Sequence, residues 1–368
     1  LKNNKGSEDN RVRKLDYSIQ LSKLFYERFI NNEDMTLFSP HETPGLYDAF
    51  GTPEFDELYK KFEKDTKIYR KKVSTQKMFM DLLKERAETG RIYIMNIDHA
   101  NSHSSFKDKV NMSNLCQEIT LPTDPIEHID GDGEIALCIL SAINVGLLKN
   151  LDELESLCDL SVRALEEIID HQKYPVRAAE ISTKARRSLG IGYIGLAHYL
   201  AKKGFNYDQK MAWKEVDKLT EAFQYYLLKS SNEIAKEKTK CDYFDKTKYS
   251  DGILPIDTYK KEVDEIVNRK LSFDWEALRK DIMQYGLRHS TLSAQMPSES
   301  SSVVSNATNG IEPPRDYLSV KKSKKGTLKQ VVPDYVRLKN NYTLLWDMKS
   351  NEGYINIVAV MQKYFDQG

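Results

Sequence analysis

A thiol, an amide and a carboxylate stand at alternate positions in the segment SNLCQEI (113–119), as Asn114, Cys116 and Glu118. In an extended chain, alternate side chains share one face about 6.6 Å apart, whereas a helix would turn the middle one away. The thiol could act as a nucleophile or hydrogen-atom donor, the carboxylate could take a proton, and the amide could hold a substrate hydroxyl. Because the pattern is loose, a buried cysteine beside ordinary surface residues is the alternative.

The other three cysteines carry weaker signals. Cys138 lies in the apolar segment GEIALCIL (133–140), where a core residue in a strand is the simpler interpretation. Cys158 and Cys241 have no motif around them, and we expect both to be structural. No CxxC pair occurs, which argues against a zinc site.

A serine-rich stretch offers a place for an anion. A proline followed by small hydroxyl residues precedes an apolar pair at 303–304, which predicts the opening of a helix. The N–H groups and dipole at such an end attract anions, and serine hydroxyls can donate to phosphate oxygens. Plain N-capping is the alternative. The candidate residues are Pro297, Ser298, Glu299, Ser300 and Ser301.

A glycine triplet imitates a dinucleotide-binding pattern. Gly190, Gly192 and Gly195 fit G-x-G-x-x-G ahead of a helix-like run, so a nicotinamide-dependent oxidoreductase is an alternative function. The context argues against it, because residues 184–188 are polar and Asp208 is a poor match for the ribose-binding acid. Glycine packing between a strand and a helix is the simpler interpretation.

The bulk composition limits the classes of protein. The 368 residues suffice for two domains or one large one, with 40% hydrophobic and 30% charged residues. Lys+Arg and Asp+Glu both number 55, so no global basic field favours nucleic acid or a membrane. The few cysteines and the lack of an apolar signal core predict a cytoplasmic protein. His99 and His103 stand four apart, but in an expected loop, so we predict no metal site.

Short strands alternating with helices predict an α/β fold that would position these groups. We expect helices within 8–35 after a turn, over 54–88, from Asn150 onward, over 216–236 and from Trp275 to Gly286. We expect an extended piece around Cys116, strands over 91–97 and from Ile135, a tight loop over 306–310 and a solvated hairpin tip over 321–326.

Taken together, the motifs resemble the large subunits of class I ribonucleotide reductases, of the bacterial and bacteriophage aerobic type. The resemblance covers essentially the whole chain, and five motifs in the same order make it specific. They are SNLCQEI (113–119), GEIALC (133–138), RRSLGIG (186–192), MPSESS (296–301) and NATNGIEPPR (306–315), with further similarity in DNRVR (9–13), LFSPH (37–41) and GILPIDTY (252–259).

The resemblance implies part of a ten-stranded α/β barrel with a central finger loop at about 110–120 and a phosphate-binding loop at about 296–302. It implies that Cys116 becomes a thiyl radical that abstracts the 3′ hydrogen of a ribonucleoside diphosphate. Glu118 would accept the 3′-hydroxyl proton and Asn114 would bind the substrate hydroxyls. Cys138 would belong to the cysteine pair that ends each turnover as a disulfide. Ser300 stands where relatives often have Thr, a tolerable change.

The resemblance also implies partners. The family's N-terminal regulatory region, with the partner of Cys138, and its C-terminal tail have no counterpart here. We therefore expect the isolated chain not to turn over without a companion chain; a truncated or inactive fragment is the alternative. The radical would come from a small subunit carrying a di-iron/tyrosyl or related cofactor, none being bound by this chain. Thioredoxin or glutaredoxin would reduce the disulfide.

Overall fold

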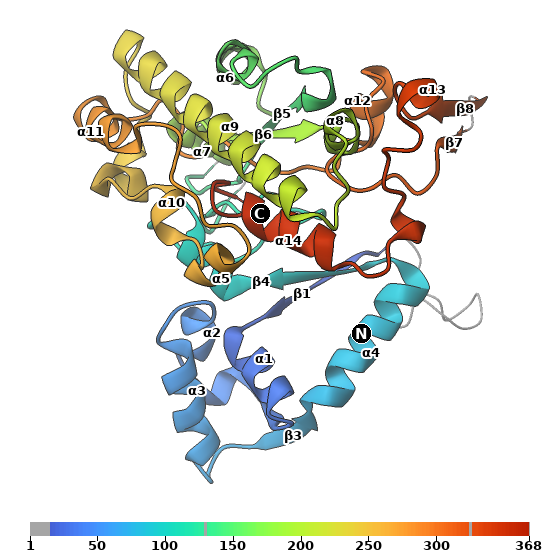
Figure 1. The fold of residues 1–368 in the computed structure, drawn as a ribbon. Helices are drawn as coiled ribbons and strands as arrows, with labels where there is room; N and C mark the ends of the chain where they lie inside the picture. The colour runs from blue at the N-terminus through green and yellow to red at the C-terminus, as the bar shows by residue number, and fades with distance from the viewer. Residues whose placement is uncertain (1–14, 129–130, 324–325, 368) are drawn as a thin grey trace. The chain divides into compact units, whose positions relative to one another are not determined.

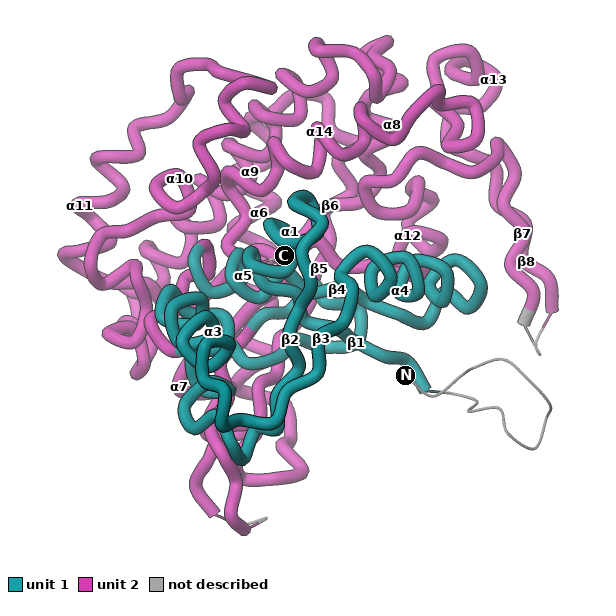
Figure 2. The backbone as a smooth tube through the Cα atoms, turned by 90° about the horizontal axis from the view of Figure 1, so that it is seen from below, with its two compact units in different colours: residues 1–102, 109–120 teal, residues 103–108, 121–368 magenta. Residues whose placement is uncertain are grey.

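The computed structural model describes residues 15–128, 131–323 and 326–367 (Figure 1). The chain divides into two compact units, coloured separately in Figure 2. Unit 1 comprises residues 1–102 and 109–120, and unit 2 comprises residues 103–108 and 121–368. Both units mix helices with short strands, and each contains a parallel strand pair, so the predicted α/β class is confirmed.

Unit 1 is built from two strand pairs and the helices that follow them. In chain order its elements are β1 (Tyr17–Leu21), α1 (Lys23–Ile30), β2 (Asp34–Phe38), α2 (Leu46–Ala49), α3 (Phe55–Lys64), β3 (Arg70–Ser74), α4 (Thr75–Thr89), β4 (Ile92–Asn96) and α5 (Ile97–His103), whose last residue belongs to unit 2. β1 pairs with β4 in parallel, and β2 pairs with β3 antiparallel. Leu21, Phe25, Leu82 and Ile92 form a buried cluster between α1, α4 and the parallel pair.

Two sequence predictions in unit 1 are partly wrong. The helix expected within 8–35 covers only Lys23–Ile30, because 17–21 pairs with β4 as a strand; residues 8–14, with the DNRVR motif, lie outside the described residues. The helix expected over 54–88 is interrupted by β3, a charged strand held by its pairing with β2. Both strands depend on partners distant in sequence, which helical spacing cannot reveal. The strand predicted over 91–97 is confirmed as β4.

Unit 2 holds the longer helices. Its strands are β5 (Ile139–Asn144), β6 (Leu189–Ile194), β7 (Leu318–Ser323) and β8 (Gly326–Val331). Its helices are α6 (Glu153–His171), α7 (Arg177–Arg186), α8 (Leu196–Lys203), α9 (Lys210–Glu237), α10 (Pro255–Thr258), α11 (Trp275–Tyr285), α12 (Glu299–Val304), α13 (Tyr335–Leu338) and α14 (Glu352–Met361).

The core of unit 2 surrounds the parallel pair β5–β6, and every residue of β6 is buried. α9 crosses the unit with α6 and α14 packed beside it (Figure 1). The predicted helices are confirmed as α6, α9 and α11, and Gly286 caps α11 as expected. The strand expected from Ile135 begins only at Ile139, because the Ile135 amide donates to the Ala178 carbonyl of α7 instead of pairing with β6.

Two smaller predictions concern 321–326 and the histidine pair. β7 and β8 pair antiparallel, and residues 324–325, on which the predicted tip falls, lie outside the described residues. His99 and His103 lie on α5 and not in a loop, so that prediction is wrong. His103 is held by the Phe365 carbonyl and the Thr258 hydroxyl, at 2.6 and 2.9 Å. In the described part of the chain, no three potential metal-ligating side chains gather.

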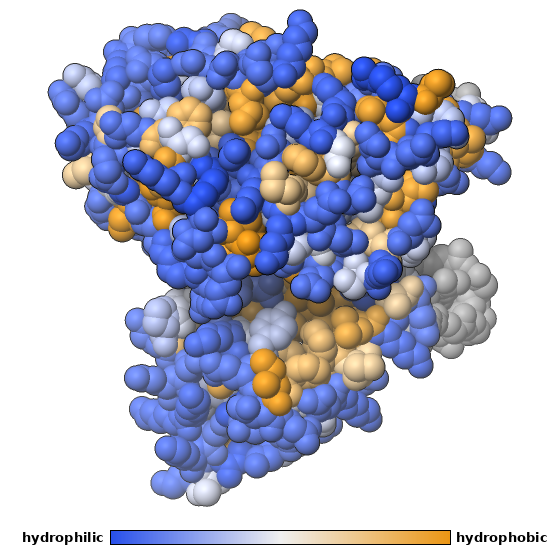
Figure 3. Space-filling view, viewed as in Figure 1, coloured by the Kyte–Doolittle hydropathy of each residue, from blue (hydrophilic) through white to orange (hydrophobic). Residues whose placement is uncertain are grey.

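On the face shown in Figure 3, hydrophilic residues predominate and are interrupted by apolar patches. Across the described residues, no helix is both long and apolar enough to span a bilayer.

Candidate active site

The segment around Cys116 forms a tight loop in unit 1. The Gln117 amide donates to the Asn114 carbonyl at 3.2 Å, which closes a turn around Leu115 and Cys116. The Asn114 amide donates to the Ile119 carbonyl at 3.3 Å, and the Ile119 amide returns a bond to Asn114 Oδ1 at 3.1 Å. The expected extended chain, with three side chains on one face, is therefore wrong. The left-handed backbone of Gln117, with φ of 69°, reverses the chain at that point.

The loop separates its three functional groups by exposure. Cys116 is exposed at the turn, and Asn114 is exposed beside it, with its side-chain oxygen already bonded to the Ile119 amide. Glu118 is only 8% exposed, and its Oε2 atom is buried with no hydrogen-bond partner in the described structure. Buried polar atoms are normally paired, so this oxygen is suited to accept a hydrogen bond or proton from a hydroxyl brought by a ligand.

Cys138 lies in unit 2, in the extended residues immediately before β5, and is half-buried. The parallel register sets Leu140 opposite Gly190 on β6. A β-carbon at position 190 would lie 2.8 Å from Cys138 Sγ and 2.6 Å from a Leu140 methyl carbon. The absence of a side chain at Gly190 therefore makes the space in which the Cys138 thiol sits. The four cysteines, all within the described residues, are thiols and not disulfides.

A buried ion pair anchors the segment that carries Cys138. The Glu134 carboxylate accepts from Arg186 Nε at 2.5 Å and from Nη2 at 2.8 Å, and Arg186 Nη2 also donates to Asp108 at 2.8 Å. Burial alone would raise the pKa of Glu134, but the Arg186 guanidinium reverses this and holds it below its usual range. Sequence reasoning missed this pair, although both residues stand inside motifs that it singled out.

The serine-rich stretch opens a helix, as predicted. Pro297 precedes Ser298, the N-cap of α12, and the first-turn N–H groups of a helix have no acceptor within it. The Ser298 side chain does not cap: its hydroxyl donates to Asn309 Oδ1 at 3.2 Å and accepts from the Gly310 amide at 3.2 Å. Plain N-capping by this hydroxyl is thus wrong. Glu299, Ser300 and Ser301 are exposed.

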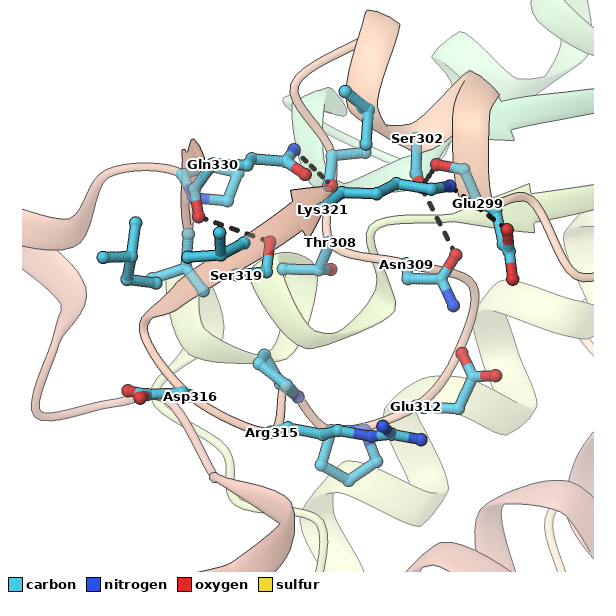
Figure 4. Close-up of a pocket in the computed structure, with 18 of the residues that line it drawn as sticks. Glu299, Ser302, Thr308, Asn309, Glu312, Arg315, Asp316, Ser319, Lys321 and Gln330 are labelled. Carbon is cyan, nitrogen blue, oxygen red and sulfur yellow. Dashed lines mark hydrogen bonds and ion pairs between the residues drawn. The ribbon is translucent and has the colours of Figure 1, made fainter. Parts of the chain in front are cut away.

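A cavity of about 590 Å³, lined by both polar and apolar side chains, lies beside this helix within unit 2 (Figure 4). Glu299 and Ser302 line it from α12, and the β7–β8 hairpin lines it with Lys321, whose ammonium lies 3.1 Å from the Glu299 carboxylate. Asn309 accepts from the Ser302 hydroxyl at 3.3 Å, which ties the turned loop 306–310 to α12. Burial raises the pKa of Glu312, which also lines the cavity.

The glycine triplet has a structural role. Gly190 and Gly192 lie inside the buried strand β6, and only Gly195 stands at the junction with α8. A β-carbon at Gly192 would lie 2.5 Å from the Ala294 carbonyl oxygen. These glycines make room for protein atoms, not for a pyrophosphate, so the nicotinamide interpretation is wrong.

Comparison with known proteins identifies the family of the chain. A family model described as the ribonucleotide reductase barrel domain matches residues 1–368. The chain belongs to this family. It is 56% identical to the ribonucleoside-diphosphate reductase subunit alpha of Haemophilus influenzae over 373 residues. It is also 56% identical to the ribonucleoside-diphosphate reductase 1 subunit alpha of Escherichia coli over 373 residues. It is 44% identical to the subunit alpha of Enterobacteria phage T4 over 377 residues. Each match covers 100% of this chain and 49% of the relative.

The chain therefore spans about half the length of the curated relatives it matches. The resemblance found in the motifs is confirmed at the level of the family and of its barrel domain. The individual site residues remain predictions, and Cys116 and Cys138 stand in different compact units of the chain.

Proposed function

We propose that this chain forms the catalytic barrel region of a ribonucleoside-diphosphate reductase alpha subunit, which makes 2′-deoxyribonucleoside diphosphates for DNA synthesis. The observation that carries the proposal is the finger loop of unit 1. An exposed thiol, Cys116, stands two residues from Glu118, whose buried carboxylate oxygen has no partner in the described structure. A thiol that removes a hydrogen atom needs such a base nearby to take up the proton of the neighbouring hydroxyl.

The proposed roles follow from these groups. Cys116, as a thiyl radical, takes the hydrogen atom from C3′ of the substrate, and Glu118 accepts the proton of the 3′-hydroxyl. Asn114 donates from its side-chain amide to a substrate hydroxyl, because its side-chain oxygen is already engaged by the Ile119 amide.

Reduction at C2′ requires two electrons and two protons, which a pair of thiols supplies. The 2′-hydroxyl leaves as water, the two thiols become a disulfide, and Cys116 returns the hydrogen atom to C3′. We assign one of these thiols to Cys138, which sits in the space left by Gly190. The second thiol would come from the part of the relatives that this chain does not match. Thioredoxin or glutaredoxin then reduces the disulfide.

The substrate diphosphate would bind at the start of α12. Pro297, Ser298, Glu299, Ser300 and Ser301 form this loop. The Glu299 and Ser300 N–H groups can donate to phosphate oxygens, whereas the Ser301 amide already donates to the Ser298 carbonyl at 2.8 Å. Ser300 is exposed and can present its hydroxyl there, whereas the Ser301 hydroxyl already donates to the Ser298 carbonyl at 2.6 Å and the Ser298 hydroxyl is bonded to the loop at 309–310.

The complete enzyme needs partners. A small subunit with a di-iron/tyrosyl-type cofactor would supply the radical. The regions that the relatives have and this chain does not match would come from the same polypeptide or from a companion chain. We place the enzyme in the cytoplasm, where thiols stay reduced.

The test is nucleotide reduction by the complete alpha polypeptide with its radical-generating partner, measured as deoxynucleotide formed from a ribonucleoside diphosphate. Cys116→Ser should lower kcat at least about 10⁴-fold, because an alcohol does not replace the thiyl radical. Cys241→Ala is the matched control, since that thiol is buried and burial raises its pKa to about 12. Loss of activity in both variants, or in neither, contradicts the assignment, and a folded wild-type complex without activity favours the inactive alternative.

A further inference from the structure

Gln117, the residue after Cys116, has an unusual backbone. Its φ of 69° lies in the left-handed region, which side chains other than glycine avoid. Among the described residues, four other non-glycine residues have a positive φ; three are Asn or Asp, which tolerate it, and the fourth is Arg187. Gln117 therefore holds a conformation that its own type does not favour, directly beside the proposed radical site.

Contacts from β1 hold this conformation. The Gln117 side-chain amide donates to the Ser18 hydroxyl, and its backbone amide donates to the Asn114 carbonyl. Two residues along β1, on the same face of that strand, the Gln20 side-chain amide donates to the Asn111 carbonyl at 2.6 Å. One face of β1 thus fastens the finger loop at two points, one before the turn and one inside it.

The torsion angles of Gln117 lie between the α-carbons of Cys116 and Glu118. They therefore set the angle between the thiol at the tip and the buried carboxylate. We propose that Gln117 and Ser18 are positioning residues, which act by fixing the direction of the Cys116 thiol relative to Glu118. This inference rests on the proposed function, because the relative direction of the two groups matters only if both act on one substrate.

The kinetic test uses the complete alpha polypeptide with its radical-generating partner. Gln117→Ala removes the bond to Ser18 but keeps the unfavourable backbone, so the turn should open part of the time. We expect kcat to fall about 3- to 10-fold while KM stays within about 2-fold, because the diphosphate is held elsewhere. Ser18→Ala should have the same effect, and the double variant should be no slower than either single one, since both remove the same bond.

Gln117→Gly separates positioning from a general structural role. Glycine adopts the left-handed conformation without strain, so this variant should recover much of the kcat lost in Gln117→Ala, despite having no side chain. If Gln117 only stabilised the fold, the losses in the alanine variant would appear in the free energy of unfolding measured with urea, and kcat of the folded enzyme would stay near the wild-type value. Three results would overturn the inference. The kcat of Gln117→Gly could be as low as that of Gln117→Ala, the variants could change KM instead of kcat, or the losses in kcat could add in the double variant.

A second readout does not depend on reductase activity. The alkylation rate of Cys116 in the chain itself, followed by mass spectrometry of its peptide, should change about 3- to 10-fold in Gln117→Ala and Ser18→Ala. Ser102→Ala is the matched control, because it removes an exposed hydroxyl that donates to the His99 carbonyl in the same unit. If Cys116 is alkylated at the same rate in all variants, Gln117 and Ser18 are not positioning residues. If the alkylation rate changes but the wild-type complex is inactive, only the proposed function is contradicted.

Discussion

Replacing Gly190 by alanine should disturb Cys138 specifically. The new β-carbon would lie 2.8 Å from the sulfur and 2.6 Å from a Leu140 methyl carbon. Non-bonded atoms prefer a separation of about 3.5–4.0 Å, so the thiol and Leu140 must retreat by roughly 1 Å. β6 cannot move away easily, because a β-carbon at 190 is also 3.3 Å from the Ala294 β-carbon on its other side. Most of the displacement therefore falls on the segment that carries Cys138.

The expected magnitude follows from this overlap. Adding a methyl group to a packed core costs about 1–3 kcal/mol, so the chain should remain folded with a lower free energy of unfolding. Disulfide formation is more sensitive, because the two β-carbons must approach to about 3.5–4.5 Å. A shift of roughly 1 Å in Cys138 exceeds the width of this range. For the disulfide proposed above, we therefore expect the yield in the complete alpha polypeptide, after one turnover without reductant, to fall about 10-fold.

Gly192→Ala is the matched control in the same strand. Its β-carbon would lie 2.5 Å from the Ala294 carbonyl oxygen and 3.1 Å from the Met296 sulfur, and Cys138 is not among its near contacts. Urea denaturation should show comparable destabilisation of the two variants. Only Gly190→Ala should change the rate at which Cys138 reacts with an alkylating reagent.

Two results would refute this reasoning. If Cys138 reacts in Gly190→Ala at the wild-type rate, the sulfur does not occupy the space that the glycine leaves. If both variants change the alkylation rate equally, the effect comes from general loosening of β6, and the contact between positions 190 and 138 has no special importance.

Two further predictions concern buried carboxylates. Burial would raise the pKa of Glu166, but hydrogen bonds from His289 and Arg187 hold it well below its usual range; its stabilisation is therefore complete above the unfolded pKa of about 4.3 and is lost as the pH falls below it. Glu166→Gln should lower the free energy of unfolding by about 3–5 kcal/mol at pH 7. It should also weaken the fall of that free energy between about pH 5 and 3. If urea denaturation gives the same pH profile for the variant and the wild type, another group causes the loss of stability in acid. Asp366 accepts from the Ser293 amide and hydroxyl at 2.8 and 2.9 Å, just before the serine-rich loop. Asp366→Asn should destabilise the chain by about 2–4 kcal/mol and raise KM for the proposed diphosphate substrate. If the variant keeps the wild-type KM and thermal stability, this carboxylate does not support the serine-rich loop.

The helices that the sequence revealed are those whose apolar spacing and end signals are local. α6 and α11 bury one face each, the middle of α9 is buried on most sides, and α11 ends at a glycine, so apolar spacing and capping sufficed. β1 and β3 were hidden because a five-residue strand is specified by its partner. β3, with the sequence RKKVS, has almost no apolar content and exists through its pairing with β2.

The candidate site shows the same division. The residue types identified Asn114, Cys116 and Glu118 as candidates that could act together. The predicted extended chain was wrong, because nothing in the local sequence indicates a glutamine in the left-handed conformation. The side chain of this glutamine donates to the Ser18 hydroxyl, 99 positions earlier in the chain. The burial of one carboxylate oxygen of Glu118 likewise depends on atoms that folding brings around it.

By itself, the sequence determined the family, the order of the motifs and the chemical groups available, since these reside in residue types and spacing. Only the tertiary structure decided that the thiol segment is a turn fastened to β1 and that Gly190 makes room for Cys138. It also decided that Ser298 bonds the 309–310 loop and does not cap its helix. Spacing fixes which side chains are present, whereas their direction and burial arise from contacts between segments far apart in the chain.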